Sequence, residues 1–151
     1  MSIIAEQSDG TMTEPILTVL MTVYNGEPYL KDAVSSILNQ TYRNFHFLIL
    51  DNASTDNSRK IIRKFKDARI ELVELIENIS HTAALNRGLK LIDTPLVARM
   101  DADDISINNR FEIQVAFMEK NPSVVLLGTA FQTIDENGDL IAHYHPPTIQ
   151  F

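Results

Sequence analysis

The sequence predicts an α/β fold in which helices cover both faces of a mostly parallel central sheet. Three observations lead to this class: short apolar runs typical of buried strands, segments with apolar side chains at helical spacing, and the alternation of the two along most of the chain. Strands joined through a helix form right-handed crossovers and pair in parallel. We therefore expect a three-layer sandwich.

The first expected strand, 16–24, ends in the turn signal Asn25-Gly26. Further strands are expected at 45–51, 69–75, 95–100 and 123–129. Helices are expected at 27–40, 54–65, 80–92 and 108–121, and Ser54 or Thr55 is available to cap the second of them. Residues 131–145 read as two strands joined around Glu136-Asn137-Gly138.

Length and composition indicate one folded domain. The chain has 151 residues, 44% of them hydrophobic, with a net charge of −7 and no cysteine. We expect a polar leader at 1–14 and one domain at 15–151. The negative charge and the lack of Lys/Arg blocks argue against a nucleic-acid partner. The lack of cysteine excludes disulfides and thiolate sites.

The sequence also gives an expectation for location. It has no signal-peptide pattern and no apolar run of the length that a membrane span needs. Together with the absence of cysteine, this predicts a cytoplasmic protein with no transmembrane segment. A peripheral position at a membrane surface stays open.

Polar and acidic residues lie at or directly after the ends of three of the expected strands. They are Tyr24-Asn25, Asp51-Asn52 and the acidic segment 101–104. In open parallel sheets, ligands bind beyond the carboxyl ends of the strands, where the strand order reverses. These residues are therefore the candidate ligand site.

Asp101, Asp103 and Asp104 form an acidic cluster that would be unfavourable without a compensating charge. A solvated loop is the simplest interpretation. An EF-hand fits poorly, because Ile105 takes a ligand position and Ser106 stands where glycine is needed. An Asp-nucleophile phosphatase would carry its motif after the first strand. The remaining interpretation is a Mg²⁺ or Mn²⁺ site shared with a phosphate-bearing ligand.

Several stretches together resemble the nucleotide-sugar-dependent glycosyltransferases of family 2. These are "VLMTVYNGEPYLKDAVSSILNQTYRNF", "LILDNASTDNS", "NRGL", "RMDADDIS" and "RFEIQVAFM", in the family's order and spacing. The resemblance covers roughly 15–129 and implies a GT-A fold, a Rossmann-like sandwich with a mostly parallel sheet. It also implies an inverting, metal-dependent transfer from a nucleoside diphosphate sugar, with UDP expected as the nucleotide, and a role in polysaccharide biosynthesis.

The resemblance assigns roles to individual residues. Thr22, Tyr24 and Asn25 would lie against the base, with Tyr24 stacking on it. Asp51-Asn52 matches a pair of aspartates whose second member usually contacts uracil. Asp101 would approach the ribose, and Asp103, with Asp101, would ligate Mn²⁺ or Mg²⁺. Further nucleotide or sugar contacts are expected from a less well matched segment that contains Asn78, His81 and Asn86.

Two departures from the family pattern matter. Asn52 stands where aspartate is usual; an amide still accepts from a ring N–H but also donates, so the base preference is open. The general base that activates the acceptor is expected beyond Phe151, in an acceptor-binding half that this chain lacks. The chain is therefore expected to be truncated, and the alternative function is a catalytically incomplete nucleotide-sugar-binding fragment. The acceptor, whether glycan, lipid or protein, is not determined.

Overall fold

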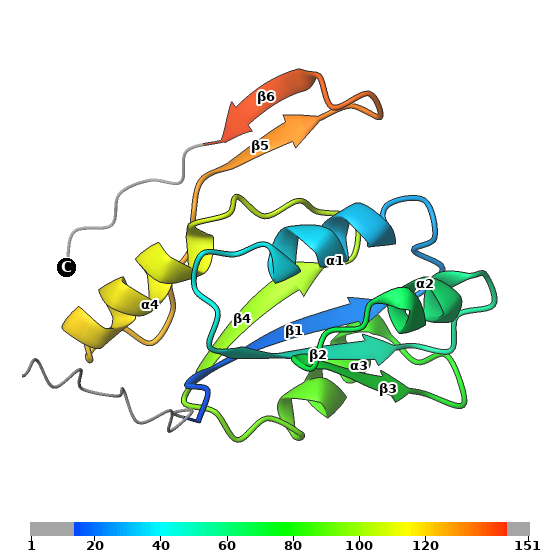
Figure 1. Ribbon diagram of the computed structural model, residues 1–151, viewed down its shortest axis with the longest axis horizontal. Coiled ribbons are helices and arrows are strands. Elements are labelled where there is room, and N and C mark those ends of the chain that lie inside the picture. Colours follow the sequence, from blue (N-terminus) through cyan, green and yellow to red (C-terminus); the bar gives the residue numbers. More distant parts are fainter. Residues whose placement is uncertain (1–13, 145–151) are drawn as a thin grey trace, which may run out of the picture. The chain divides into compact units, whose positions relative to one another are not determined.

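The computed structural model describes residues 14–144 (Figure 1). Its contacts divide the chain between Val115 and Ala116 into two units, and each is described by itself. The elements of the first unit are β1 Leu17–Val23, α1 Leu30–Leu38, β2 Phe45–Asp51, α2 Ser58–Lys64, β3 Ile70–Glu74, α3 His81–Leu89 and β4 Leu96–Asp101. Helix α4, Arg110–Lys120, crosses the division, and β5 Phe131–Ile134 and β6 Leu140–Tyr144 follow.

The four strands of the first unit form one parallel sheet in the order β3-β2-β1-β4. The chain moves outward from β1 through β2 to β3 and then returns to the other side of β1. The order therefore reverses between β1 and β4, and a ligand is expected at the carboxyl ends of these two strands. The register places Thr22 opposite Asp101 at that point.

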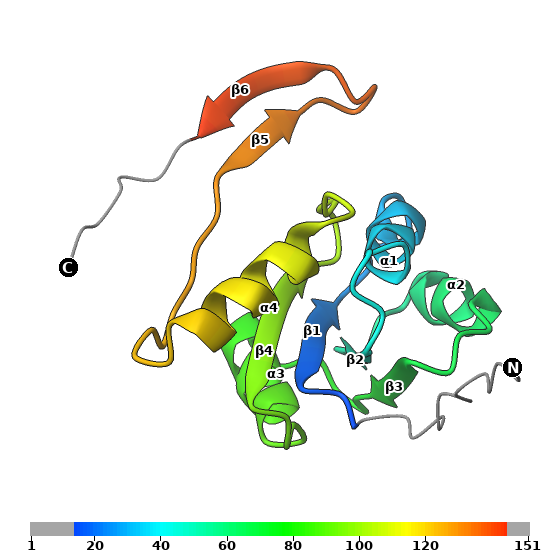
Figure 2. The ribbon, with the colours of Figure 1, turned by 60° about the vertical axis from the view of Figure 1, so that its left-hand side comes forward.

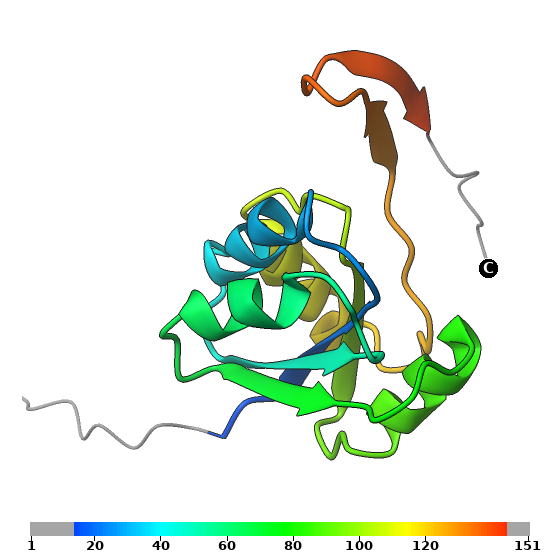
Figure 3. The same cartoon turned by 90° about the vertical axis from the view of Figure 1, so that its right-hand side faces the viewer.

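The two faces of the sheet are covered by different helices, as the alternation of side chains along a strand requires. Val19 and Met21 of β1 belong to a core that includes residues of α1 and α2, and Phe111 of α4 packs edge-on against Phe45. Leu50, on the opposite face of β2, packs with Ala84 of α3. Figure 3 shows α1 and α2 on one side of the sheet and α3 on the other. The predicted three-layer α/β sandwich is confirmed.

Gly88 allows α3 to lie close to β1. A Cβ atom at this position would be 2.5 Å from Cδ1 of Leu20 and 3.2 Å from its Cδ2. The helix axis can approach the strand this closely because glycine has no side chain there.

The second unit contains a β-hairpin (Figure 2). β5 and β6 pair antiparallel, with an irregularity at Thr133/Ile134, and the ring of Phe131 stacks on Tyr144 at 4.7 Å. Gly138 takes a φ of 86° in the connecting turn, where a left-handed residue is required. The prediction of two strands around 136–138 is confirmed.

Two sequence predictions about elements are wrong. Residues 123–129 form no strand, and Val125 and Leu126 are exposed, because this apolar run has no neighbouring strand to pair with in the described residues. Helix α2 begins at Ser58 and not at 54, and its N-cap position is Asn57, with no side-chain cap bond. Ser54 and Thr55 do not cap it because both bond to the loop after β1.

The leader predicted at 1–14 lies, apart from Glu14, outside the described residues. Within residues 14–144, none of the helices combines the length and the apolar character that a membrane crossing requires.

Candidate functional site

A cleft of about 530 Å³ lies at the carboxyl ends of β1 and β4. It is lined by Thr22, Tyr24, Asn25, Gly26, Pro28, Tyr29, His81, Arg99, Asp101, Ala102 and Asp103. The cleft therefore coincides with the point where the strand order reverses. Six residues that the sequence singled out line it together: Thr22, Tyr24, Asn25, His81, Asp101 and Asp103.

The loop after β1 is joined to the loop after β2 by side-chain hydrogen bonds. Asn25, in a left-handed conformation with φ 53°, donates its backbone N–H to Ser54 Oγ at 3.0 Å. Its side-chain Oδ1 accepts from the backbone N–H of Thr55 at 2.8 Å. Ala53 is also left-handed, with φ 61°, a conformation that costs a residue with a Cβ about 1–2 kcal/mol. The loop that follows β1 and the loop that follows β2 are therefore held together by these hydrogen bonds.

Further bonds join the residues after Asn25 to the start of α2. Gly26 donates to Ser58 Oγ at 2.9 Å, and Glu27 donates its N–H to Asp56 Oδ2 at 3.0 Å. Glu27 Oε2 accepts in turn from the N–H of Asn57. Burial acts to raise the pKa of Asp56, but the hydrogen bonds from Ser58 and Glu27 together lower it below its ordinary value. The carboxylate is thus the form that supports the loop.

Asp51 is fully buried at the end of β2, with 0% exposure. Its Oδ2 accepts from the backbone N–H of Ser54 at 3.2 Å and from Nε of Arg59 at 2.5 Å. The hydrogen bond to Asp51 is the main cause that raises the pKa of Arg59. The other oxygen, Oδ1, has no donor within residues 14–144. A buried acceptor without a partner is unfavourable. Asp51 is not among the residues that line the cleft, so this oxygen lies behind the cleft wall and not on its surface.

The side chain of Asn52 is engaged with the backbone of Ile79. Its Nδ2 donates to the carbonyl of Ile79 at 2.7 Å, and its Oδ1 accepts from the N–H of Ile79 at 3.0 Å. Asn78 then donates its side-chain amide to the carbonyl of Asn52 at 2.9 Å. A carboxylate could not make the first of these bonds, because it has no donor. This gives a physical reason for asparagine at position 52.

Arginine side chains lie beside the acidic residues at the end of β4. Arg99 Nη2 donates to Asp101 Oδ1 at 2.5 Å. Burial raises the pKa of Asp104, and the neighbouring charges of Asp101 and Asp103 raise it further. The opposing arginines, Arg99 and Arg110, offset only part of this. The repulsion anticipated from the sequence is therefore present in the folded chain.

The same loop is suitable for a divalent cation that is shared with a ligand. Asp101 and Asp103 both line the cleft, but the part of the chain that the structure describes holds no group of three or more His, Cys, Asp or Glu that could bind a metal. Mg²⁺ is usually held by one or two carboxylates together with substrate phosphates, so two carboxylates at an open cleft fit this chemistry. Mn²⁺ takes the same oxygen ligands.

The remaining predicted residues are placed differently. Thr22 Oγ1 lies 3.4 Å from Nδ1 of His81, which begins α3 directly after its cap Ser80. Asn86 is exposed on α3 and is not among the residues that line the cleft. The less well matched segment thus brings His81 to the cleft and leaves Asn78 and Asn86 outside its lining. Asp51 and Asn52 do not line the cleft either.

Sequence reasoning missed Arg99 as a site residue. It stands two positions before Asp101 in a strand, so both side chains lie on the same face of the sheet. This two-residue spacing could have identified Arg99 as a neighbour of Asp101 from the sequence. Tyr29, just before α1, was missed as well, because its place in the cleft depends on the fold of the 24–29 loop.

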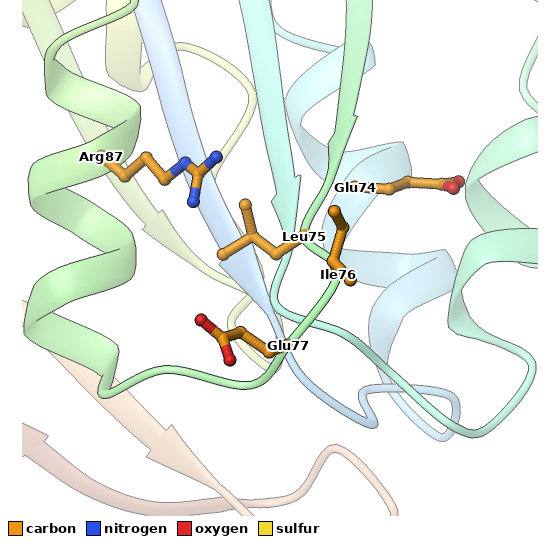
Figure 4. Close-up of a pocket in the computed structure, with 5 residues that line it drawn as sticks. All are labelled: Glu74, Leu75, Ile76, Glu77 and Arg87. Atoms are coloured by element: carbon orange, nitrogen blue, oxygen red, sulfur yellow. The ribbon is translucent and has the colours of Figure 1, made fainter.

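A smaller pocket of about 270 Å³ lies at the carboxyl end of β3, lined by Glu74, Leu75, Ile76, Glu77 and Arg87 (Figure 4). Arg87 reaches over Leu75 from α3, and Glu77 follows β3. None of the residues predicted for the site lines this pocket. Its mixed charges give no preference for one ligand chemistry.

With the fold and the cleft in place, comparison with known proteins identifies the class. A family model described as glycosyl transferase family 2 matches residues 18–150. The chain belongs to this family. The resemblance noted from its motifs is therefore confirmed.

Relatives and solved structures agree with this class. An uncharacterised glycosyltransferase of Methanocaldococcus jannaschii is 36% identical over 94% of this chain and 50% of its own length. The Escherichia coli UDP-Glc:α-D-GlcNAc-diphosphoundecaprenol β-1,3-glucosyltransferase WfgD is 33% identical over 83% of this chain and 49% of its own. Residues 1–349 of Staphylococcus aureus TarS, in complex with UDP, superimpose with a TM-score of 0.66 at 23% identity, over 70% of this chain and 32% of that one.

A mannosyltransferase of Pyrobaculum calidifontis, solved with GDP-Man and Mn²⁺, also has a TM-score of 0.66, at 25% identity over 78% of this chain and 35% of its own. These likenesses confirm the GT-A fold. The chain spans about half the length of the two curated relatives.

Proposed function

We propose that this chain is the nucleotide-sugar-binding part of a family 2 glycosyltransferase, which transfers a sugar from a nucleoside diphosphate donor with inversion. The single observation that carries this proposal is the cleft at the ends of β1 and β4, which gathers six predicted site residues at the point of strand-order reversal. Family membership supports the same conclusion.

The base is proposed to bind over the loops after β1 and β2. Tyr24 is half-exposed in the cleft wall and can stack on a base. Asp51 Oδ1, which lacks a donor in residues 14–144, is the acceptor we assign to a ring N–H. Because Asp51 is fully buried and does not line the cleft, this contact requires the loop after β2 to open when the nucleotide binds. Asn52 already uses its amide on Ile79, so we give it a supporting role in this contact. UDP is the preferred nucleotide because the E. coli relative is named for UDP-Glc.

Asp103 and Asp101 are the residues proposed to hold Mn²⁺ or Mg²⁺. When bound there, a divalent cation would neutralise the donor diphosphate and stabilise the charge of the leaving group. The Mn²⁺ in the Pyrobaculum mannosyltransferase complex supports this choice. The chain's own residues would orient the donor: Thr22 and His81 from one side of the cleft and Asp101 at the ribose.

The acceptor and the general base are not assigned to residues of this chain. In an inverting transfer, a base takes the proton of the acceptor hydroxyl as its oxygen attacks the anomeric carbon. The carboxylates of the cleft, Asp101 and Asp103, are assigned to the donor side. Because the chain spans about half of its curated relatives, a second candidate function is donor binding without turnover.

The proposal is tested by calorimetry with UDP and GDP, each with and without Mn²⁺. We expect UDP to bind, and to bind more tightly with Mn²⁺, with Asp103→Asn removing the metal-dependent part. Failure of both nucleotides under both conditions would overturn the proposal. Mass spectrometry after incubation with UDP-sugars then separates the two functions, since transfer or donor hydrolysis indicates an enzyme and binding alone indicates a binding fragment.

A further inference from the structure

Arg99 is a cation built into the acidic side of the cleft. It lies on β4 on the same face as Asp101, and its side chain is 57% exposed. Its Nη2 donates to Asp101 Oδ1, one of the oxygens assigned above to the metal. The arginine therefore competes with a divalent cation for the Asp101 carboxylate, because it already occupies one of its two oxygens.

The second arginine beside this loop is fixed in place. Arg110 donates from Nε to Gln114 at 3.2 Å and from Nη2 to the carbonyl of Arg99 at 3.0 Å. Partial burial lowers the pKa of Arg110. Arg110 is thus bonded to the backbone of β4 and to its own helix, whereas the Arg99 side chain donates to Asp101.

The ion pair between Arg99 and Asp101 is partly exposed, so either side chain can take another partner at little cost in stability. Pairs between exposed side chains contribute little to stability, because solvent screens them and both side chains lose freedom. A divalent cation on Asp101 would repel the guanidinium, whereas a diphosphate in the same cleft would attract it. The planar fork of arginine matches the oxygens of a phosphate.

We propose that Arg99 acts as an exchangeable counter-ion. It holds Asp101 when no divalent cation is present, and it transfers to the diphosphate of the donor when a cation and a donor bind. This inference rests on the proposed function, since it requires a diphosphate ligand and a metal in this cleft. Under this inference Arg99 is a binding residue. Its removal would raise the affinity for the metal and lower the affinity for the nucleotide.

The experiment measures the two affinities separately on the purified chain. Electron paramagnetic resonance gives the dissociation constant of Mn²⁺ alone, and calorimetry gives that of UDP at saturating Mn²⁺. The variants are Arg99→Gln and Arg99→Lys. The matched control is Arg63→Gln, which removes the same charge from an exposed arginine that pairs with Glu74 and does not line the cleft.

For Arg99→Gln we expect Mn²⁺ alone to bind about 2- to 5-fold more tightly, because its competitor at Asp101 is gone. We expect UDP with Mn²⁺ to bind about tenfold more weakly, because a charge-assisted bond to the diphosphate is lost. Arg99→Lys should keep the wild-type Mn²⁺ affinity and recover part of the UDP affinity. Arg63→Gln should leave both within about twofold of wild type.

Two results would overturn the inference and are distinguishable from each other. If wild type binds UDP with Mn²⁺ but Arg99→Gln behaves like Arg63→Gln, or loses affinity for both ligands, the exchange is wrong and the proposed function stands. If wild type binds no UDP with Mn²⁺, the proposed function fails and the inference fails with it.

Discussion

Gln40, two residues beyond the end of α1, accepts a hydrogen bond from the backbone N–H of Phe111 at the start of α4, at 3.1 Å. Its side chain is fully buried, and its Nε2 donates to the carbonyl of Ile107 at 2.6 Å and to Ser106 Oγ at 3.2 Å. One amide therefore anchors both ends of the segment between the acidic loop and α4.

Replacement of this amide with a side chain of similar size and no polar atoms should be strongly destabilising. In Gln40→Leu the N–H of Phe111 and the carbonyl of Ile107 would be buried without partners, which we expect to lower the free energy of unfolding by about 2–4 kcal/mol. Urea denaturation measures the change. The control is Gln114→Leu, which loses a bond to Arg110 near the surface and should cost less than about 1 kcal/mol. Equal effects of the two variants would contradict this role of Gln40.

Asn52→Asp tests why the chain departs from the family pattern at this position. The variant keeps the acceptor for the N–H of Ile79 but loses the donor to its carbonyl, and it places a carboxylate beside that oxygen. We expect a loss of about 1–3 kcal/mol of unfolding free energy at pH 7, measured by urea denaturation.

A matched variant, Asn86→Asp, makes the same chemical change at an exposed position of α3. It should alter stability by less than about 0.5 kcal/mol. If Asn52→Asp were as stable as wild type, the donated bond to Ile79 would contribute nothing, and asparagine at this position would need another explanation.

Local sequence was sufficient to predict the sheet and the position of the cleft. The strands at 16–24 and 45–51 are mostly apolar because β1 and β2 lie in the middle of the sheet and are buried on both faces. The strand at 95–100 is less apolar, and β4 at the edge of the sheet is partly exposed. The polar residues that follow them could then be assigned to one edge of the sheet. Asp101 and Asp103 do line the cleft at that edge, while their roles stay predictions.

What the sequence did not reveal depends on partners that are distant along the chain. Asn52 meets Ile79 only after β3 has been added to the sheet, so its amide was assigned to a base and its bonds to the backbone were not foreseen. The apolar run 123–129 resembles a strand, but a strand exists only where another strand pairs with it. Ser54 was predicted as a helix cap because its bond to Asn25 cannot be read from local spacing.

The raised pKa of Asp104 predicts a pH-dependent effect on stability. The folded state binds the proton of Asp104 more tightly than the unfolded state, so this group favours folding at low pH and loses that contribution as pH rises through its folded pKa. Asp104→Asn, which stays neutral, should therefore raise Tm slightly at pH 7 and leave it unchanged near the acid end of the titration. Thermal unfolding followed by circular dichroism across the pH range measures this.

The control for Asp104→Asn is Asp93→Asn, which removes an exposed carboxylate outside the acidic loop. It should not show a stabilisation that grows with pH. A lower Tm for Asp104→Asn at pH 7 would show that the carboxylate stabilises the loop, contrary to the direction given by burial and by its neighbours Asp101 and Asp103.

Gly88→Ala tests whether the close approach of α3 to β1 is required. Alanine would gain about 1 kcal/mol of helix propensity, but its Cβ would be 2.5 Å from Cδ1 of Leu20. Leu20 is buried, so it cannot move into solvent, and overpacking of this kind costs about 1–3 kcal/mol. We expect steric crowding to prevail and the unfolding free energy measured in urea to fall by about 1 kcal/mol.

Two further variants identify the cause of that loss. Gly128→Ala adds the same methyl group where no atom lies within 4 Å, and it should be neutral or slightly stabilising. The double variant Gly88→Ala/Leu20→Val shortens the facing side chain and should be more stable than the sum of its single changes predicts, because each relieves the strain of the other. Additive effects would mean that Gly88 and Leu20 do not compete for the same space. In that case the position of α3, and of His81 at its start, would have to be set by contacts other than this one.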